Sequence, residues 1–271
     1  MTTLDYLEPH RLIPADPEIA ARLTEKYNSI SHGESVSATT RAGLAIGGAA
    51  IAMAAVANSA FGQGNLPRMV TDILNFALTL EYLESEFYVK GVGTAGLIPT
   101  GMAPVFDQIR KHEVAHVQFL KSVLGSNAVA KPNFDFTAHG AFSDVFSNFK
   151  TFATLAQAFE DTGVRAYKGQ AANLIGHNDV LLPALRIHSV EARHASQVRR
   201  MRGQKGWITG NSRGDMPAAT QGVYEGDNNK FQFILAQIDS HDTALTEGFD
   251  EPLTKGQVLE IVKPFMTGGV Q

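Results

Sequence analysis

The chain has 271 residues, of which 44% are hydrophobic and 18% are charged, and its formal net charge is −4. This is enough apolar material for one sizeable core, and the weak negative charge without a clustered basic face speaks against a nucleic-acid binder. The sequence contains no cysteine, which excludes disulfides, thiolate zinc sites, iron–sulfur clusters and cysteine nucleophiles.

An N-terminal extension is predicted over residues 1–64. Its residues 42–57, AGLAIGGAAIAMAAVA, carry no charge, and Ala55-Val56-Ala57 fits a signal-peptidase pattern. The run is short for a membrane span, which needs about twenty apolar residues. Several acidic residues precede it, which a standard export signal would not have. We expect an exported, periplasmic protein; a cytoplasmic protein, or one associated with a membrane through 42–57, stays open as the alternative.

Four long helices are predicted in residues 65–205 from apolar positions that recur at helical spacing. Prolines and glycines set their ends, and the expected helices are Pro67–Lys90, Pro104–Leu124, Asn148–Ile175 and Asp179–Arg202. The connection 126–145 between the second and third helices is far longer than the about two to eight residues that usually join antiparallel neighbours. This length predicts a four-helix bundle with a long crossover.

A C-terminal extension, 206–271, is expected to pack on this bundle. It is rich in glycine, asparagine and aspartate up to Asn229, and two further helices are predicted at Lys230–Asp242 and Lys255–Lys263. Strand-like alternation is not sustained anywhere in the chain, so the fold class is all-α.

Two stretches repeat the same arrangement of carboxylates and histidines. Glu81 precedes a Glu-x-x-His pair, and so does Glu160; the complete predicted set is Glu81, Glu113, His116, Glu160, Glu191 and His194. Residues three apart on a helix point the same way, and each pair lies in an apolar stripe. Buried carboxylates without cations are costly, so the pattern predicts two metal ions in the bundle core. Mixed oxygen and imidazole ligands favour two iron or two manganese ions.

Several neighbouring residues leave alternatives open. Tyr88 and Tyr167 lie at matched positions in the two halves and are candidates for a catalytic radical or hydrogen-bonding role, or for core aromatics. Glu84 aligns with Gly163 rather than with Glu160, so it is predicted outside the ligand set or at the surface. His188, one turn before Glu191, is predicted to be a hydrogen-bonded core histidine, and an additional metal ligand or a hydrogen-bond donor to a ligand is the alternative.

A rival reading comes from His112-Glu113-Val114-Ala115-His116, which has the H-E-x-x-H pattern of zinc proteases. That pattern is short, its extended form is missing, and it leaves the ligands of the second half unexplained.

The segment Asn75–Glu84, with Glu86-Phe87-Tyr88, resembles the first helix of ferritin-like domain proteins related to plant desiccation-related protein. The tail Gly248–Leu253, with Pro264-Phe265, is similar to the end of that family. The resemblance implies a ferritin-like four-helix bundle with a di-iron or di-manganese centre. It further implies that Glu113 and Glu191 bridge the metals, that Glu81 and Glu160 are terminal ligands, and that each metal takes one histidine.

The resemblance also implies a redox activity toward O2 or peroxide, in protection against oxidative or desiccation stress. Whether the chain is a ferroxidase, a peroxidase or a catalase-like oxidoreductase stays open. The alternative is a non-catalytic structural, assembly or stress protein on the same frame. Metal ions with O2 or peroxide are the expected partners, and a homo-oligomer or larger assembly is expected. Members of this family often carry twin-arginine export signals, whereas only Arg41 flanks the apolar run here.

Overall fold

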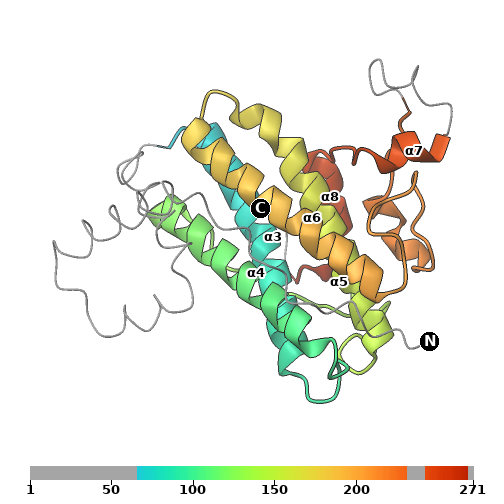
Figure 1. The fold of residues 1–271 in the computed structure, drawn as a ribbon. Coiled ribbons are helices and arrows are strands. Elements are labelled where there is room, and N and C mark those ends of the chain that lie inside the picture. The colour runs from blue at the N-terminus through green and yellow to red at the C-terminus, as the bar shows by residue number, and fades with distance from the viewer. Residues whose placement is uncertain (1–65, 231–241, 268–271) are drawn as a thin grey trace, which may run out of the picture. The chain divides into compact units, whose positions relative to one another are not determined.

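The computed structural model describes residues 66–230 and 242–267, which fold as helices joined by loops (Figure 1). Four long helices make the bundle: α3 (Arg68–Gly93), α4 (Ala103–Leu124), α5 (Phe149–Ala171) and α6 (Asn178–Met201). Helix α3 packs along α4, α5 packs along α6, and α3 also contacts α5. The predicted all-α four-helix bundle is confirmed.

The helix ends follow the signals in the sequence. Proline occupies the first turn of α4, where its missing N–H costs nothing, and Gly125 follows the helix with a φ of 56°. Asn148 caps α5, because its side chain accepts a hydrogen bond from the Lys150 N–H over 3.0 Å. A short 3-10 turn, η2 (Ala172–Leu174), extends α5 before Gly176 turns the chain with a φ of 91°.

One predicted helix end was wrong. Helix α3 does not stop at Gly91 but continues to Gly93. Gly91 is buried, and a Cβ atom there would lie 2.1 Å from Cε2 of Phe152. The glycine therefore serves close packing between α3 and α5 rather than helix termination.

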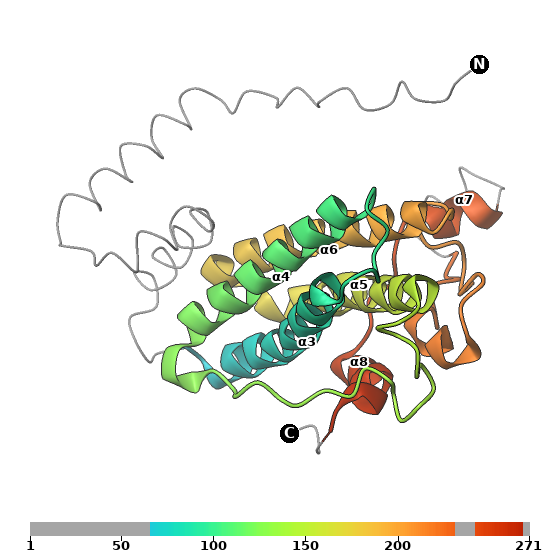
Figure 2. The ribbon, with the colours of Figure 1, turned by 90° about the horizontal axis from the view of Figure 1, so that it is seen from below.

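The connection between α4 and α5 is long, as the crossover prediction required. After the short turn η1 (Gly125–Asn127), it passes α8 (Lys255–Val262) before reaching α5 (Figure 2). Its middle pairs with the end of the chain: the Asp135 N–H donates to the Phe265 carbonyl, and Phe134 and Met266 form an isolated antiparallel bridge. Phe136 packs from this connection into the core.

The C-terminal part adds short helical elements beside the bundle. These are η3 (Ala218–Val223), α7 (Asp242–Glu247), the predicted helix α8, and η5 (Lys263–Phe265). Thr254 starts α8 with a capping box that Gln257 completes. The helix expected at 230–242 falls almost wholly outside the described residues, and α7 was not predicted. The boundaries 1–64, 65–205 and 206–271 stay a prediction.

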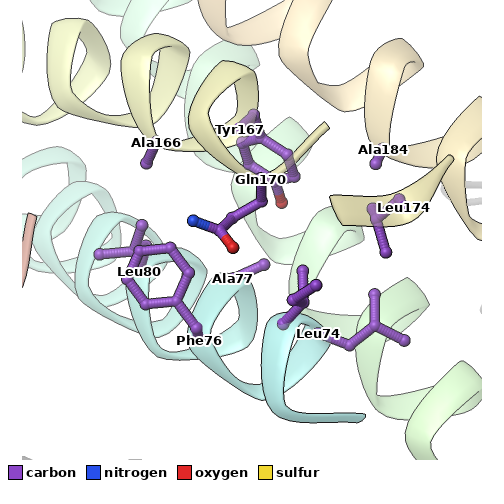
Figure 3. A pocket seen from close by; sticks show the side chains of 10 residues that line it. Leu74, Phe76, Ala77, Leu80, Ala166, Tyr167, Gln170, Leu174 and Ala184 are labelled. Atoms are coloured by element: carbon purple, nitrogen blue, oxygen red, sulfur yellow. The ribbon is translucent and has the colours of Figure 1, made fainter. Parts of the chain in front are cut away.

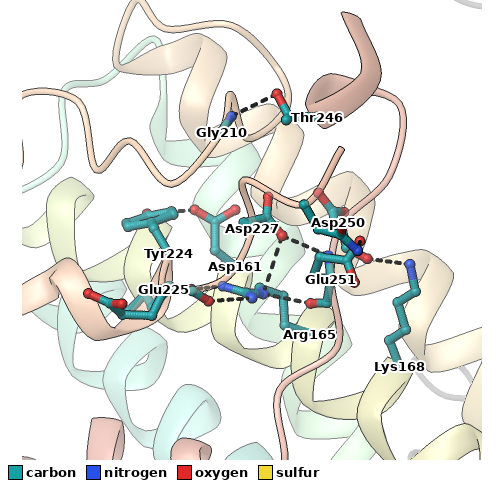
Figure 4. Close-up of polar contacts among 12 residues, drawn as sticks. Asp161, Arg165, Lys168, Gly210, Tyr224, Glu225, Asp227, Thr246, Asp250 and Glu251 are labelled. Atoms are coloured by element: carbon teal, nitrogen blue, oxygen red, sulfur yellow. Dashed lines mark hydrogen bonds and ion pairs between the residues drawn. The ribbon is translucent and has the colours of Figure 1, made fainter. Parts of the chain in front are cut away.

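Arg165 of α5 anchors this C-terminal part (Figure 4). Its side chain is fully buried and donates hydrogen bonds to the carbonyls of Val223, Glu225 and Glu251. Its Nε also lies 3.6 Å from the Asp227 carboxylate. One charged side chain thus satisfies three loop carbonyls that would otherwise be buried without partners.

Two apolar clusters occupy the bundle. One centres on the stacked and edge-on rings around Phe87, and the other gathers around Leu78 and Leu120. None of the described helices combines the length and the apolar character needed to cross a bilayer. The segment 42–57, with its predicted export or membrane role, lies outside the described residues.

Candidate metal centre

The structure brings the six predicted ligands together in the bundle core. All four carboxylates are fully buried, His194 is 5% exposed, and His116 is only slightly more open. They form two groups whose ligand atoms lie within 4.8 Å of one another. The first group is Glu81, Glu113, His116 and Glu191; the second is Glu113, Glu160, Glu191 and His194. Glu113 and Glu191 belong to both groups, so each half of the repeat supplies one shared carboxylate.

The shared carboxylate of Glu113 reaches toward both histidines. Its Oε2 lies 3.3 Å from Nδ1 of His116, and its Oε1 lies 2.9 Å from Nδ1 of His194. Glu191 reaches His116 in turn, with Oε1 3.1 Å from Nδ1. One oxygen facing each way is the arrangement that a carboxylate needs to bridge two cations.

The two unshared carboxylates have matching surroundings. Oε2 of Glu81 lies 3.2 Å from Nδ1 of His116, and Oε2 of Glu160 lies 3.2 Å from Nδ1 of His194. Their other oxygens accept hydrogen bonds from tyrosines of the opposite half. Tyr88 donates to Glu160 over 2.6 Å, and Tyr167 donates to Glu81. Each tyrosine therefore holds the carboxylate that the other helix pair contributes.

Several buried polar atoms of this cluster have no hydrogen-bond partner among the described residues. They are Oε1 of Glu113, Oε2 of Glu160, both carboxylate oxygens of Glu191, and Nδ1 of His194. Leaving such atoms unsatisfied is costly, more so for charged groups. Cations between the carboxylates would satisfy them together, so the donor set fits two metal ions that prefer oxygen and imidazole ligands.

The electrostatics of the cluster point the same way. Burial raises the pKa of Glu81 to about 7, although His116 beside it opposes the shift. Burial, with Glu113 and Glu81 nearby, also raises the pKa of Glu191 well above its usual value. Burial acts against the charge of His194, yet Glu160 and Glu113 raise its pKa to about 11. Without cations, the cluster is therefore short of positive charge. Glu81, Glu191 and His194 keep their protons to a higher pH than usual.

His112, the first histidine of the protease-like pattern, lies outside both ligand groups. Nδ1 of His112 lies 2.9 Å from Nε2 of His194, and its Nε2 lies 2.7 Å from the Gln108 amide nitrogen. His112 thus contacts the ring nitrogen of His194 that points away from the carboxylates. A second contact of this kind orients a ligating imidazole. The second half has Val190 at the corresponding position.

Two expectations about neighbouring residues are corrected in part or in full. Of the two alternatives for Glu84, the surface position is wrong, because Glu84 is 3% exposed in the interior of the bundle. His188 is not a hydrogen-bonded core histidine, because its buried Nε2 has no partner in the described part of the chain.

An ion pair beside the site was not predicted. The guanidinium of Arg199 donates two hydrogen bonds to the Asp161 carboxylate, and the sequence carried no signal for this pairing.

A small apolar pocket adjoins the centre between α3, α5 and the start of α6 (Figure 3). Its lining includes Leu74, Leu80, Ala166, Leu174 and the ring of Tyr167, the residue that donates to Glu81. The cavity volume is about 20 Å³, which is room for about one water molecule. The apolar lining suits a small uncharged molecule better than an ion.

Comparison with known proteins agrees with this geometry. The ferritin-like domain family matches residues 69–204, which contain the four long helices except Arg68, the first residue of α3, and all six predicted ligands. A search of curated proteins found no match. The match covers half of the chain, and the chain therefore belongs to the ferritin-like domain family.

Proposed function

We propose that this protein holds two iron or two manganese ions and is redox-active toward O2 or peroxide. The observation that carries the proposal is the pair of buried ligand groups that share Glu113 and Glu191. Four carboxylates balance two divalent ions and leave both imidazoles as neutral ligands. Iron and manganese both accept such mixed ligand sets.

Each residue has a distinct part in this proposal. Glu113 and Glu191 would be shared between the two ions, Glu81 and Glu160 would each hold one ion, and His116 and His194 would each supply one imidazole. Tyr88 and Tyr167 position the carboxylates of Glu160 and Glu81 by donating a hydrogen bond to one oxygen of each. When bound, the ions supply one-electron redox chemistry and a place for O2 or peroxide to bind. The apolar pocket beside Tyr167 offers a small uncharged molecule a place close to Glu81.

We place this activity in protection against oxidative or desiccation stress, outside the cytoplasm. The proposal rests on the resemblance of Asn75–Glu84 and Gly248–Leu253 to desiccation-related proteins and on the apolar run 42–57. Assembly into a homo-oligomer belongs to the same proposal.

The test is the metal content of the isolated full-length protein, measured by elemental analysis before and after anaerobic loading with Fe(II) or Mn(II). We expect about two ions per chain, as the two ligand groups require. Glu113→Ala removes one oxygen from each group and should lose both ions. Glu86→Ala is the matched control, because Glu86 lies on α3 but pairs with Lys90 and Lys131 outside the centre. Oxidation of the loaded protein by O2 or peroxide then tests the redox part.

The second candidate is a structural or stress protein on a ferritin-like frame. The long N-terminal extension keeps this alternative open. A wild-type protein that takes up no iron or manganese after anaerobic loading would favour it and would overturn the proposed activity. Full metal occupancy without any reaction toward O2 or peroxide would limit the ions to a stabilising role.

A further inference from the structure

A seventh buried carboxylate faces the centre. Glu84 follows Glu81 by three residues on α3, so both side chains leave the same face of the helix. Glu84 is 3% exposed, and both oxygens of Glu191 beside it have no hydrogen-bond partner among the described residues. Its pKa lies well above the usual value because of burial and because Glu191, Glu113 and Glu160 lie close enough to repel its charge. A buried carboxyl group without a cation is costly, and the residues around Glu84 do not provide one.

Gly163 on α5 makes room for this carboxyl group. A Cβ atom at Gly163 would lie 3.1 Å from Oε1 of Glu84 and 3.3 Å from Oε2 of Glu191. Any larger residue at this position would therefore press on both carboxylates. In the repeat, Gly163 is the counterpart of Glu84 itself, three residues after Glu160. The glutamate of one half thus occupies the space that the glycine of the other half leaves open.

We infer that Glu84 is a seventh protein ligand of the di-metal centre, which binds beside the shared carboxylate of Glu191 and makes the two metal positions unequal. The inference rests on the proposed function, since it needs the ions to be bound. Six ligands are related by the repeat, and Glu84 has no counterpart, so its carboxylate adds negative charge that the other half of the repeat does not match. An additional hard oxygen ligand favours an ion of higher charge, and the asymmetry therefore gives the two ions different affinities.

The first test compares Glu84→Gln with wild-type protein by calorimetric titration with Mn(II) or anaerobic Fe(II). Glutamine keeps the size of the side chain but removes its charge. We expect one of the two binding steps to weaken by about tenfold or more, while the other step keeps its affinity. Glu86→Gln is the matched control and should leave both steps unchanged, since Glu86 pairs with Lys90 and Lys131.

Gly163→Ala provides a second variant that changes none of the ligand residues. Its methyl group comes closest to Oε1 of Glu84, at 3.1 Å, and should displace that carboxyl group, so the same binding step should weaken. Mössbauer spectra of protein loaded with ⁵⁷Fe give an independent readout. Wild-type protein should show two different iron environments, and the environment of only one iron should change in Glu84→Gln.

The outcomes separate this inference from the proposed function. Wild-type protein that binds two ions, with isotherms and spectra identical in Glu84→Gln, would overturn the role of Glu84 and leave the di-metal centre intact. Wild-type protein that binds no ions would overturn both. Weakening of the same binding step in Glu84→Gln and in Gly163→Ala, with both steps unchanged in Glu86→Gln, is the result that the inference requires.

Discussion

At the scale of single residues, the two tyrosines cross-link the halves of the repeat. Tyr88 lies on the helix of Glu81 but donates to Glu160, and Tyr167 lies on the helix of Glu160 but donates to Glu81. Both hydroxyl groups are buried, and both pKa values lie well above normal because of burial and the neighbouring carboxylates. The tyrosines therefore stay protonated donors at any physiological pH.

Tyr88→Phe and Tyr167→Phe should each destabilise the fold without emptying the centre. Each change removes one buried hydrogen bond to a carboxylate, which lowers the free energy of unfolding by about 1–3 kcal/mol. Urea unfolding checks the loss, and elemental analysis checks that metal content is kept. Because the two positions are equivalent in the repeat, similar losses are expected. Unchanged unfolding in both variants would contradict the hydrogen bonds. A slower reaction of either variant with O2 or peroxide would support the catalytic role, which stays a prediction.

At the scale of helices, the sequence predicted what depends on local signals. Pro104, Asn148, Gly125 and Gly176 act within one turn of a helix, so their effect is visible without the fold. The repeat revealed the six candidate ligands because each half carries a Glu-x-x-His pair at nearly the same distance after a glutamate.

Other features depend on residues far apart in the chain and could not be predicted. Gly91 resembles a helix stop, and only the ring of Phe152 across the bundle explains it. The burial of Glu84 depends on Gly163, which the alignment of the two halves could identify but could not place in space. Nothing near Arg165 in the sequence indicates that it binds carbonyls at Val223 and Glu251.

Gly169→Ala should disrupt the contact between α5 and the C-terminal part. A Cβ atom at Gly169 would lie 1.9 Å from the Leu253 carbonyl oxygen, a backbone atom that cannot rotate away. We expect a loss of about 1–3 kcal/mol in unfolding free energy, as for other overpacked sites. The control is Gly256→Ala in α8, where a Cβ atom would meet nothing within 4 Å. Alanine there should be neutral or stabilise the helix by up to about 1 kcal/mol. Equal stability of the two variants would contradict the close approach.

At the scale of the whole molecule, the centre lies within a bundle that has its own apolar support. The cluster around Phe87 and the cluster around Leu78 and Leu120 consist of buried side chains whose packing needs no metal. Arg165 separately binds the C-terminal part to α5. We therefore expect the helices to stay folded when the metal is removed. The loss of folding free energy should arise only at the carboxylates that no longer have a cation beside them.

The free energy of unfolding of metal-free protein should therefore depend on pH. A group whose pKa is higher in the folded than in the unfolded chain stabilises the fold fully at low pH and loses this contribution as pH rises through the folded value. For Glu81, whose pKa burial raises from 4.5 to about 7, the loss falls between these values. For His194 the loss begins above 6.5 and continues toward about 11. Metal-free protein should therefore unfold at lower temperature at about pH 8 than at about pH 5.5.

Metal-loaded protein should behave in the opposite way. Ions must displace the protons that the histidines and Glu81 hold, so their affinity rises with pH, and tighter binding to the folded state raises its stability. The difference in unfolding temperature between loaded and chelated protein should widen from about pH 5.5 to about pH 8, while circular dichroism shows the same helix content in both.

Glu81→Gln removes one of the titrating groups and should flatten the pH dependence of the metal-free protein. A chelated protein that loses its helices would show that the ions hold the bundle together and would favour the structural reading. A constant difference across this range would show that the ions bind without releasing protons, which the buried carboxylates and imidazoles do not allow.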